Sequence, residues 1–351
     1  MDHLAFSTQL QDVARRQNKV LNASIELLSA CNCKCIHCYH NEHMQGGLSF
    51  EQYISVIDQL KNEGVFDIQL TGGEIFLRSD LLEIIDYIFN KHISIEIFTN
   101  ATLITEDIAK KLVRKIKTCY VSIYGYTKEI YEAVTQTEGS FNSFLDGVNL
   151  LLKYNIPVQF NVVVLKENYH EMNDMIDFCS KKLHCQKNDS RIRVSFNVLP
   201  QKNGCDNNVA HAINGVDFIN GIDTLYFGNT PPKYSEMIVN TPNLEVAPCR
   251  AGNWSINITA SGDVTPCMCF PLVFGNVHDR SISEILSGEI SKKHRSINVA
   301  NIEGCSSCEL INFCSLCIGQ IYTISGSYMC DQKSDLCRQT KEFVSYLLSK
   351  Q

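Results

Sequence analysis

The 351-residue chain has no excess of basic residues, no long hydrophobic run and no internal repeat. Its 31 Lys and Arg against 38 Asp and Glu give a net charge of −7, so it carries no basic footprint for nucleic acid. No segment has the apolar character of a signal peptide or of a membrane span. The sequence therefore predicts a protein that binds neither nucleic acid nor membrane.

Cysteine, in contrast, is abundant, with 17 residues. In a secreted chain this number would indicate disulfides, but without a signal segment the better interpretation is a cytoplasmic protein whose thiols are kept reduced for metal. Cys119 and Cys179 fall in apolar patterns and are expected to be small core residues. Cys185 and Cys205 lie in polar segments, where a lone thiol could be reactive. The others form two groups, one near the start of the chain and one in its last third.

Cys31, Cys35 and Cys38 form the first group, with the spacing C-x3-C-x2-C directly after an apolar run at 23–28. Three thiolates on one tight loop hold three irons of a cubane iron–sulfur cluster and leave the fourth iron open to a small chelating ligand. A zinc knuckle is the alternative, because C-x2-C pairs also bind zinc. Cys33 adds a fourth thiol out of register, which we interpret as a non-ligand.

The loop resembles the signature C-x3-C-x-aromatic-C of the radical S-adenosylmethionine (SAM) enzymes, with His37 in the aromatic position. In that family the amino and carboxylate groups of SAM bind the open iron of a [4Fe-4S] cluster. One electron then cleaves SAM to a 5′-deoxyadenosyl radical. The resemblance implies that Cys31, Cys35 and Cys38 are the catalytic cluster ligands and that His37 belongs to the SAM site.

A second motif, Gly72-Gly73-Glu74, follows a strand pattern at 65–70. Paired glycines permit close backbone approach, and a carboxylate there can accept the ammonium group of a ligand. The motif is similar to the GGE motif of radical SAM enzymes, whose strand end receives the methionine moiety of SAM. The resemblance therefore places all three residues in the SAM site.

Other strand ends complete this expected site by the same resemblance. Thr99, Asn100 and Ser122 lie where family members touch the ribose or carboxylate of SAM, and Leu199 lies where backbone atoms meet the adenine. A Thr-Asn pair at a strand end is also commonly a turn or a helix cap, and that alternative stays open.

Strand patterns alternate with helical ones along the first two thirds of the chain. Further strands are expected at 94–100, 118–125, 157–164 and 192–199, with helices such as 81–89 and 107–116 between them. With the strands before the two motifs, this makes six βα units. The pattern predicts an α/β fold that matches the partial (β/α)6, TIM-like barrel of radical SAM enzymes, with both motifs at carboxyl ends of strands.

The second cysteine group begins with Cys249, followed by Gly262 and Cys267, and continues as C-x2-C-x5-C-x2-C over 305–317. Cys330 and Cys337 come last. The pattern resembles the SPASM extension of radical SAM enzymes, although that extension usually has three residues where this chain has two before Cys317. The resemblance implies two auxiliary [4Fe-4S] clusters.

The implied ligands divide between the two auxiliary clusters. The first cluster would be held by Cys249, Cys267 and Cys317, with Cys269 as a candidate fourth ligand. The second would be held by Cys305, Cys308, Cys314 and Cys337, and the choice between Cys330 and Cys337 stays open. A hairpin at 254–266 is expected to bring Cys249 and Cys267 together. Without a fourth protein ligand, the first cluster could bind a substrate thiolate or backbone atom.

Four parts are expected along the chain. They are an N-terminal helical segment at 1–20, the radical SAM partial barrel at 21–200, a linker rich in turn residues at 201–248, and a small cysteine-rich α+β SPASM domain at 249–351. A last helix at 334–348 closes the chain.

The preferred function is reductive cleavage of SAM and abstraction of a hydrogen atom from a peptide or protein side chain. The product would be a thioether, a carbon–carbon crosslink or an oxidised side chain in a ribosomally made peptide. The alternatives are a dehydrogenase acting on a small molecule, a sulfatase-type formylglycine maturase and, from another class, a non-catalytic iron–sulfur electron carrier or zinc scaffold.

Three partners are expected. They are the peptide or protein substrate, a reductant such as flavodoxin or ferredoxin, and a separate leader-binding protein. About twenty residues precede the barrel, too few for the winged-helix leader-binding domain of many peptide maturases, so leader recognition is expected from such a separate protein or from the barrel rim.

Overall fold

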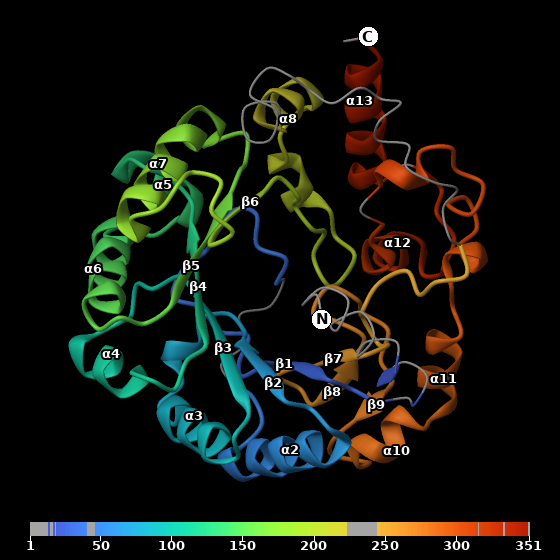
Figure 1. Cartoon of the computed structure of the whole chain (residues 1–351), viewed down its shortest axis with the longest axis horizontal. Coiled ribbons are helices and arrows are strands. Elements are labelled where there is room, and N and C mark those ends of the chain that lie inside the picture. Colours follow the sequence, from blue (N-terminus) through green and yellow to red (C-terminus); the bar gives the residue numbers. More distant parts are fainter. Residues whose placement is uncertain are drawn as a thin grey trace, which may run out of the picture.

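The computed structural model describes residues 13–14, 17, 19–40, 46–222, 244–314, 316–332 and 334–349. Within them, one nine-stranded sheet has the order β6-β5-β4-β3-β2-β1-β7-β8-β9 (Figure 1). Its strands are β1 (Asn22–Glu26), β2 (Asp67–Thr71), β3 (Ser94–Thr99), β4 (Thr118–Ile123), β5 (Val158–Val163), β6 (Ile192–Ser195), β7 (Ser255–Ile258), β8 (Asp263–Thr265) and β9 (Gly275–Asn276).

Helices follow most of the strands. They are α2 (Phe50–Glu63), α3 (Leu81–Asn90), α4 (Glu106–Leu112), α5 (Lys128–Thr135), α6 (Ser140–Lys153), α7 (Met172–Leu183), α8 (Gly215–Ile222), α10 (Ile282–Leu286), α11 (Glu289–Arg295), α12 (Ile318–Ser325) and α13 (Asp335–Ser349). Short 3-10 helices are η1 (Ile75–Leu77), η2 (Tyr169–Glu171), η3 (Asn207–His211), η5 (Val299–Asn301) and η6 (Ile311–Phe313).

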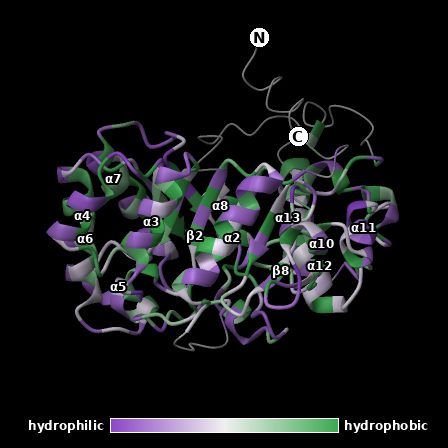
Figure 2. Cartoon of the chain, turned by 90° about the horizontal axis from the view of Figure 1, so that it is seen from below, coloured by the Kyte–Doolittle hydropathy of each residue, from purple (hydrophilic) through white to green (hydrophobic). Residues whose placement is uncertain are grey.

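Strands β1 to β6 are all parallel and joined through helices, so the predicted six-unit α/β core is confirmed. The sheet is open, and α2, α3, α4 and α6 lie along its outer side (Figure 1). Figure 2 shows hydrophilic and hydrophobic residues side by side on these helices, as amphipathic helices require.

The two faces of the parallel sheet differ in polarity. Residues such as Ile68, Ile97 and Val121 are fully buried in the same core as the helices. The alternate positions carry polar side chains, including Gln69, Glu96 and Asn161, all partly exposed. Because successive side chains of a strand point to opposite faces, the inner face of the curved sheet is polar and open to a ligand.

Helix α2 shows how the sequence sets local structure. Ser49 caps its N-terminus in a capping box with Gln52, and Gly64, in the left-handed region with φ 102°, ends it. Its apolar stripe, which includes Tyr53 and Leu60, is buried. The Tyr53 hydroxyl donates to the backbone oxygen of Leu27, so the helix also holds the chain just past β1.

The expected hairpin is present, since β7 and β8 pair antiparallel with Asn257 opposite Thr265. The same β7 also pairs in parallel with β1, with Ile258 opposite Ile25. One sheet therefore runs through both cysteine-containing parts of the chain, which the sequence did not predict.

The strand predicted at 192–199 is longer than β6, which ends at Ser195. Phe196 and Val198 are buried even so. Phe196 meets the ring of Phe218 on α8 edge-on, with ring centroids 5.6 Å apart. Their apolar alternation therefore reflects packing against α8, and Leu199 lies beyond the strand.

The predicted division into four parts stays a prediction. Most of segment 1–20 and residues 223–243 of the expected linker lie outside the described residues. The described part of 201–248 contains η3 and α8, and α8 packs against α13. Across the described ranges, the structure has no helix long and apolar enough to cross a membrane.

Candidate functional site

The signature loop begins where β1 ends, and the end of β2 holds its first residues. Gly73 N donates to Leu28 O at 2.9 Å, and Glu74 N donates to Ala30 O at 2.9 Å. A Cβ atom on Gly72 would stand 2.3 Å from Leu28 O, and one on Gly73 would stand 2.1 Å from Ala30 O. Both glycines are therefore required by the close approach of the two strand ends.

Glu74 is fully buried and is satisfied by the chain itself. Its Oε1 accepts from Phe76 N at 3.1 Å and from Thr99 Oγ1 at 2.9 Å, and its Oε2 accepts from Asn100 N at 2.8 Å. Burial raises the pKa of this carboxyl to about 7. The side chain ties the end of β2 to the end of β3, and its predicted contact with SAM stays a prediction.

Asn100 connects this junction to the cysteines. Its Nδ2 donates to Asn32 Oδ1 at 3.0 Å and lies 3.9 Å from Cys31 Sγ and 3.6 Å from Cys33 Sγ. Hydrogen bonds to cluster sulfurs are one of the influences that set a cluster's reduction potential. Asn100 is thus brought to the signature loop, with Thr99 beside it at the end of β3, and the predicted contacts of both residues with SAM stay a prediction.

The rest of the loop is pinned against α5. Lys34 N donates to Thr135 O at 2.9 Å, and Ile36 N donates to Val134 O at 3.0 Å. Cys33 is buried inside the loop, with its N donating to Cys31 Sγ at 3.4 Å. Its interpretation as a non-ligand stays a prediction.

Asn208 holds the far side of the loop. Its Nδ2 lies 3.2 Å from His37 O, 3.3 Å from Cys38 O and 2.7 Å from Leu199 O. Leu199 is therefore next to the signature loop even though it lies beyond β6. Among the described residues, His37 Nδ1 is buried without a hydrogen-bond partner, which leaves an acceptor or donor for a ligand.

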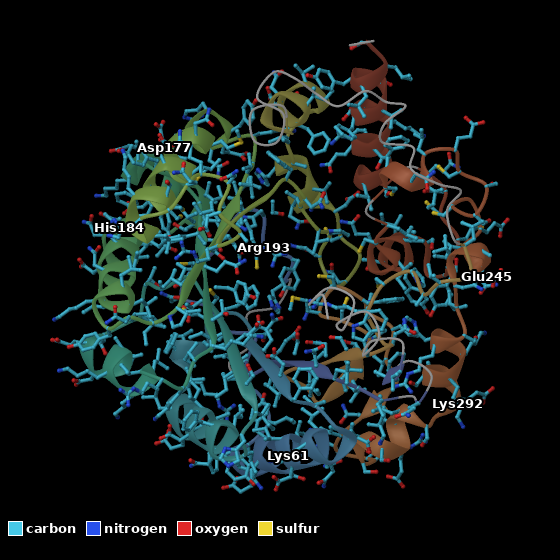
Figure 3. The ribbon with its side chains drawn as sticks, viewed as in Figure 1. Lys61, Asp177, His184, Arg193, Glu245 and Lys292 are labelled. Atoms are coloured by element: carbon cyan, nitrogen blue, oxygen red, sulfur yellow. The ribbon has the colours of Figure 1, made fainter. Side chains whose placement is uncertain are left out.

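Ser122 lies on the polar inner face, in register with Asn161 of β5, which in turn is in register with Arg193 of β6. Neighbours in register on parallel strands point to the same side, so these three form one row. Figure 3 places Arg193 near the centre of the view, whereas Lys61, His184 and Lys292 lie at the periphery.

The cysteines expected to hold the first auxiliary cluster come together. The Cys267 and Cys269 side chains hydrogen-bond to each other. Burial raises the pKa of Cys249 to about 11, and the neighbouring Cys267 and Cys317 add to the rise. Burial also raises the pKa of Cys317, and the nearby Cys267 thiol adds to that rise. The four cysteines form one partly exposed group, which includes Cys269.

The cysteines expected to hold the second auxiliary cluster line one small cavity of about 30 Å³. The lining thiols are Cys305, Cys308, Cys314, Cys330 and Cys337. The structure therefore brings together both residues between which the sequence left the choice open. The sulfurs of Cys330 and Cys337 are 3.7 Å apart.

A cavity of about 130 Å³ lies between the signature loop and the first auxiliary group, lined by Tyr39 and Lys202 on one side and Met268 and Cys269 on the other. The Tyr39 hydroxyl donates to Met268 Sδ at 3.7 Å. Lys202 Nζ is 2.5 Å from Oε1 of the buried Glu26. Tyr39, next to Cys38, therefore spans the distance between the two cysteine groups.

Two family models match this chain. The radical SAM superfamily model matches residues 25–179, and the SPASM model, an iron–sulfur cluster-binding domain, matches residues 249–309. The chain therefore contains a radical SAM domain followed by a SPASM domain. The chain is therefore an enzyme, and SAM and iron–sulfur clusters are its cofactors. The predicted combination of a radical SAM domain with a SPASM domain is confirmed.

Two curated relatives are similar to this chain in sequence, and a solved structure is similar to it in fold. The chain is 28% identical to the antilisterial bacteriocin subtilosin biosynthesis protein AlbA of Bacillus subtilis, over 78% of this chain and 61% of AlbA. It is 25% identical to the AdoMet-dependent heme synthase of Methanosarcina barkeri, over 90% of this chain and 96% of that protein. The crystal structure of Streptococcus suis SuiB bound to precursor peptide SuiA superposes with a TM-score of 0.70 at 16% identity, covering 95% of this chain and 80% of SuiB.

The residues present in this radical SAM chain fit its cofactors. Among the described residues, no three His, Cys, Asp or Glu side chains converge on the point that one metal ion would occupy. The matches to the radical SAM model and to the iron–sulfur cluster-binding model favour clusters over the zinc alternative. His37 Nδ1, which is buried without a hydrogen-bond partner, adds a polar group within the signature loop.

Sequence reasoning about this radical SAM chain missed Asn208, Lys202, Asn161 and Arg193. Asn208 and Lys202 come from the stretch interpreted as a linker, and nothing in their local sequence signals a contact with the signature loop. Asn161 and Arg193 lie in predicted strands at the positions that face the polar side. Pairing by register was the signal that could have found them.

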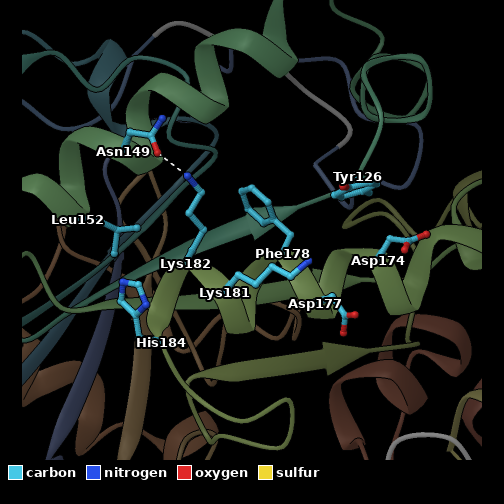
Figure 4. Close-up of a pocket in the computed structure, with 9 residues that line it drawn as sticks. All are labelled: Tyr126, Asn149, Leu152, Asp174, Asp177, Phe178, Lys181, Lys182 and His184. Atoms are coloured by element: carbon cyan, nitrogen blue, oxygen red, sulfur yellow. Dashed lines mark hydrogen bonds between the residues drawn. The ribbon is translucent and has the colours of Figure 1, made fainter.

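A cavity of about 520 Å³, larger than those at the cysteine sites, lies on the outside of the radical SAM core between α6 and α7 (Figure 4). Its lining includes Asn149 and Lys182, whose Nζ donates to Asn149 Oδ1 at 2.6 Å. No predicted cofactor ligand lines it, so size alone does not locate this site.

Proposed function

We propose that this enzyme modifies a peptide or protein side chain by removing a hydrogen atom from it. The observation that carries the proposal is the cavity of about 130 Å³ between the signature loop and the first auxiliary cysteines. Pockets for whole small molecules have volumes of about 300–1,000 Å³. A cavity well below that size suits one side chain of a longer substrate whose backbone stays outside.

The comparisons support the same substrate class. AlbA is a bacteriocin biosynthesis protein, and the superposed SuiB is bound to a precursor peptide. The product we propose is a thioether, a carbon–carbon crosslink or an oxidised side chain in a ribosomally made peptide. A reductant such as flavodoxin or ferredoxin, a separate leader-binding protein and a cytoplasmic location remain parts of this proposal.

Each part of the site has a proposed role. Cys31, Cys35 and Cys38 would hold the cluster that binds SAM, while the strand ends at Gly72-Gly73-Glu74, Thr99 and Asn100 keep the loop in place. SAM bound at this cluster would supply the radical chemistry that removes a hydrogen atom from the substrate side chain. Tyr39 and Met268 would close the cavity around the side chain and exclude water.

The auxiliary ligands belong to the proposal as well. Cys249, Cys267 and Cys317 would hold the first auxiliary cluster, and the position of Cys269 favours it as the fourth ligand. A fourth thiolate would leave no iron of that cluster open to substrate. We therefore propose that the first auxiliary cluster takes up an electron from the substrate and does not bind the substrate directly.

The proposal is tested with anaerobically reconstituted enzyme, SAM, a strong reductant and peptides encoded beside its gene. The expected result is 5′-deoxyadenosine together with a peptide that has lost two hydrogens, measured by mass spectrometry. Cys35→Ala is expected to abolish both products. Cys308→Ala is expected to keep 5′-deoxyadenosine formation and to lose the modified peptide.

A second candidate function follows from the heme synthase match, which spans 96% of that relative. It is oxidation of a small molecule of the size of a porphyrin. The same assay separates the two functions when a porphyrin replaces the peptide. Turnover of the porphyrin with unchanged peptides would overturn the peptide proposal.

A further inference from the structure

The second auxiliary site has one thiol more than a cubane cluster needs. Cys305, Cys308 and Cys314 lie on consecutive turns, in which Cys308 N donates to Cys305 O at 3.0 Å and Ile311 N donates to Cys308 O at 3.2 Å. Cys330 and Cys337 line the same cavity. Four irons with one thiolate each leave a fifth thiol to be explained.

Cys330 is held by its backbone. Cys330 N donates to Glu303 O at 2.8 Å, and Glu303 and Met329 form a β-bridge. Gly304 packs so closely that a Cβ atom there would stand 2.1 Å from Cys330 O. This thiol is therefore fixed beside Cys305, the first cysteine of the site, and is only 7% exposed.

Cys337 is held by its side chain and by the start of α13. Its Sγ accepts from Ser334 Oγ at 3.2 Å, and its N donates to the same oxygen at 3.2 Å. A hydroxyl donor and the first turn of a helix both favour a thiolate. Each of the two cysteines therefore has the surroundings of a ligand.

We propose that Cys330 and Cys337 are interchangeable as the fourth ligand of the second auxiliary cluster. Their sulfurs are 3.7 Å apart, so one iron within reach of either can pass to the other with a small side-chain movement. The proposal rests on the cluster assignment in the proposed function. It adds a ligand that the family pattern, with its single last cysteine, does not contain.

The test is the iron and sulfide content of four variants after anaerobic reconstitution. Cys330→Ala and Cys337→Ala are each expected to keep the wild-type content. The double variant Cys330→Ala/Cys337→Ala is expected to lose about four irons per chain, the content of one cubane cluster. Loss of a cluster in either single variant, or its retention in the double variant, overturns the proposal.

The double variant Cys305→Ala/Cys330→Ala separates this proposal from the proposed function. It leaves three of the five thiols, Cys308, Cys314 and Cys337, so it should lose the same four irons as Cys330→Ala/Cys337→Ala. Wild-type iron in Cys305→Ala/Cys330→Ala would show that no cluster is held there, and both assignments would then fail. Binding of SAM by each variant confirms that the rest of the chain is folded.

A second measurement needs no substitution. Iodoacetamide treatment of the anaerobic, iron-loaded wild-type enzyme, followed by digestion and mass spectrometry, is expected to label Cys330 in some chains and Cys337 in others. No chain should carry both labels. Label confined to one of the two cysteines would identify the other as a fixed ligand and overturn the proposal.

Discussion

Asn208 donates hydrogen bonds to the signature loop, although it lies outside both cysteine groups. It is buried, and one amide nitrogen serves the carbonyls of His37, Cys38 and Leu199. These carbonyls come from two segments that are far apart in the sequence. The side chain therefore fixes the spacing between the loop and the position expected to meet the adenine of SAM.

Replacing Asn208 with Ala is expected to weaken both folding and SAM binding. Loss of the shared donor leaves buried carbonyl oxygens unsatisfied, which lowers the free energy of unfolding by about 1–3 kcal/mol. The loop would then move relative to Leu199, so we expect the dissociation constant for SAM to rise several-fold. Denaturant unfolding and equilibrium SAM binding by the reconstituted enzyme measure the two effects.

Asn207→Ala is the matched control, because Asn207 is the same residue type next to Asn208 and its side chain is exposed. Substitutions at such surface positions usually change stability by no more than about 0.5 kcal/mol. If Asn208→Ala bound SAM as tightly as Asn207→Ala does, the proposed fixing role would be wrong.

The sequence revealed the residues that belong to short motifs, but not the contacts between residues that are far apart in the chain. The cysteines and the Gly-Gly-Glu motif are short patterns whose chemistry can be read from neighbouring positions. The partners of Glu74 and Asn208 depend on which strand ends meet in space. The contacts of Glu74 in the structure are with Phe76, Thr99 and Asn100, and its predicted contact with SAM stays a prediction.

At the scale of elements, the approach of β2 to the chain after β1 sets the position of the signature loop. The obstacle to a side chain at Gly73 is Ala30 O, a backbone atom that cannot rotate away. Two hydrogen bonds join residues 28 and 30 to residues 73 and 74. The position of the signature loop therefore depends on the close contact between these two strand ends.

Gly73→Ala is expected to push the two strand ends apart. Overpacking of this kind costs about 1–3 kcal/mol of unfolding free energy. It should also lower the iron content of the first cluster, because Cys31 follows Ala30 directly. Denaturant unfolding and iron analysis after reconstitution measure the two losses.

Gly139→Ala serves as the control for glycine replacement. Gly139 has φ 78°, and a Cβ atom there would have nothing within 4 Å. Its cost is therefore backbone strain of about 1–2 kcal/mol, with no displacement of the loop. Equal iron contents in the two variants would show that the close approach at Gly73 does not position the cysteines.

The element boundaries show where sequence patterns stop being informative. Helices 81–89 and 107–116 were predicted, and α3 and α4 occupy those positions as Leu81–Asn90 and Glu106–Leu112. The strand at 192–199 was predicted too long because alternation of apolar residues looks the same whether the partner is a strand or α8. Only the tertiary contact of Phe196 with Phe218 distinguishes the two.

At the scale of the whole molecule, the continuous sheet joins the radical SAM core to the SPASM hairpin. Leu21 N and Asn22 N donate to Trp254 O at 2.9 and 3.2 Å, and β1 then pairs with β7 along its length. The sequence predicted a hairpin and a linker but not this pairing. The apolar pattern of β7 is satisfied equally by a hairpin alone, so it carries no information about β1.

A continuous sheet predicts that the two parts unfold together. Trp254, the only tryptophan of the chain, reports on the junction, while the visible absorbance of the clusters reports on the cysteine sites. In anaerobic guanidinium unfolding of the iron-loaded enzyme, we expect both signals and the far-ultraviolet circular dichroism to change at one midpoint. Separate midpoints would mean that the sheet is not a cooperative unit.

Ile258→Ala sharpens this test, because Ile258 is fully buried on β7 opposite Ile25 of β1. Truncating such a residue costs about 2–5 kcal/mol. In a cooperative molecule the loss must lower the midpoint of every signal by the same amount, including the far-ultraviolet signal dominated by the radical SAM core. Ile290→Ala, at an exposed position of α11, should leave all midpoints nearly unchanged. A shift confined to the Trp254 signal would show that the hairpin unfolds without the core. The pairing of β1 with β7 would then contribute little to the placement of the signature loop and the first auxiliary cysteines on either side of one cavity.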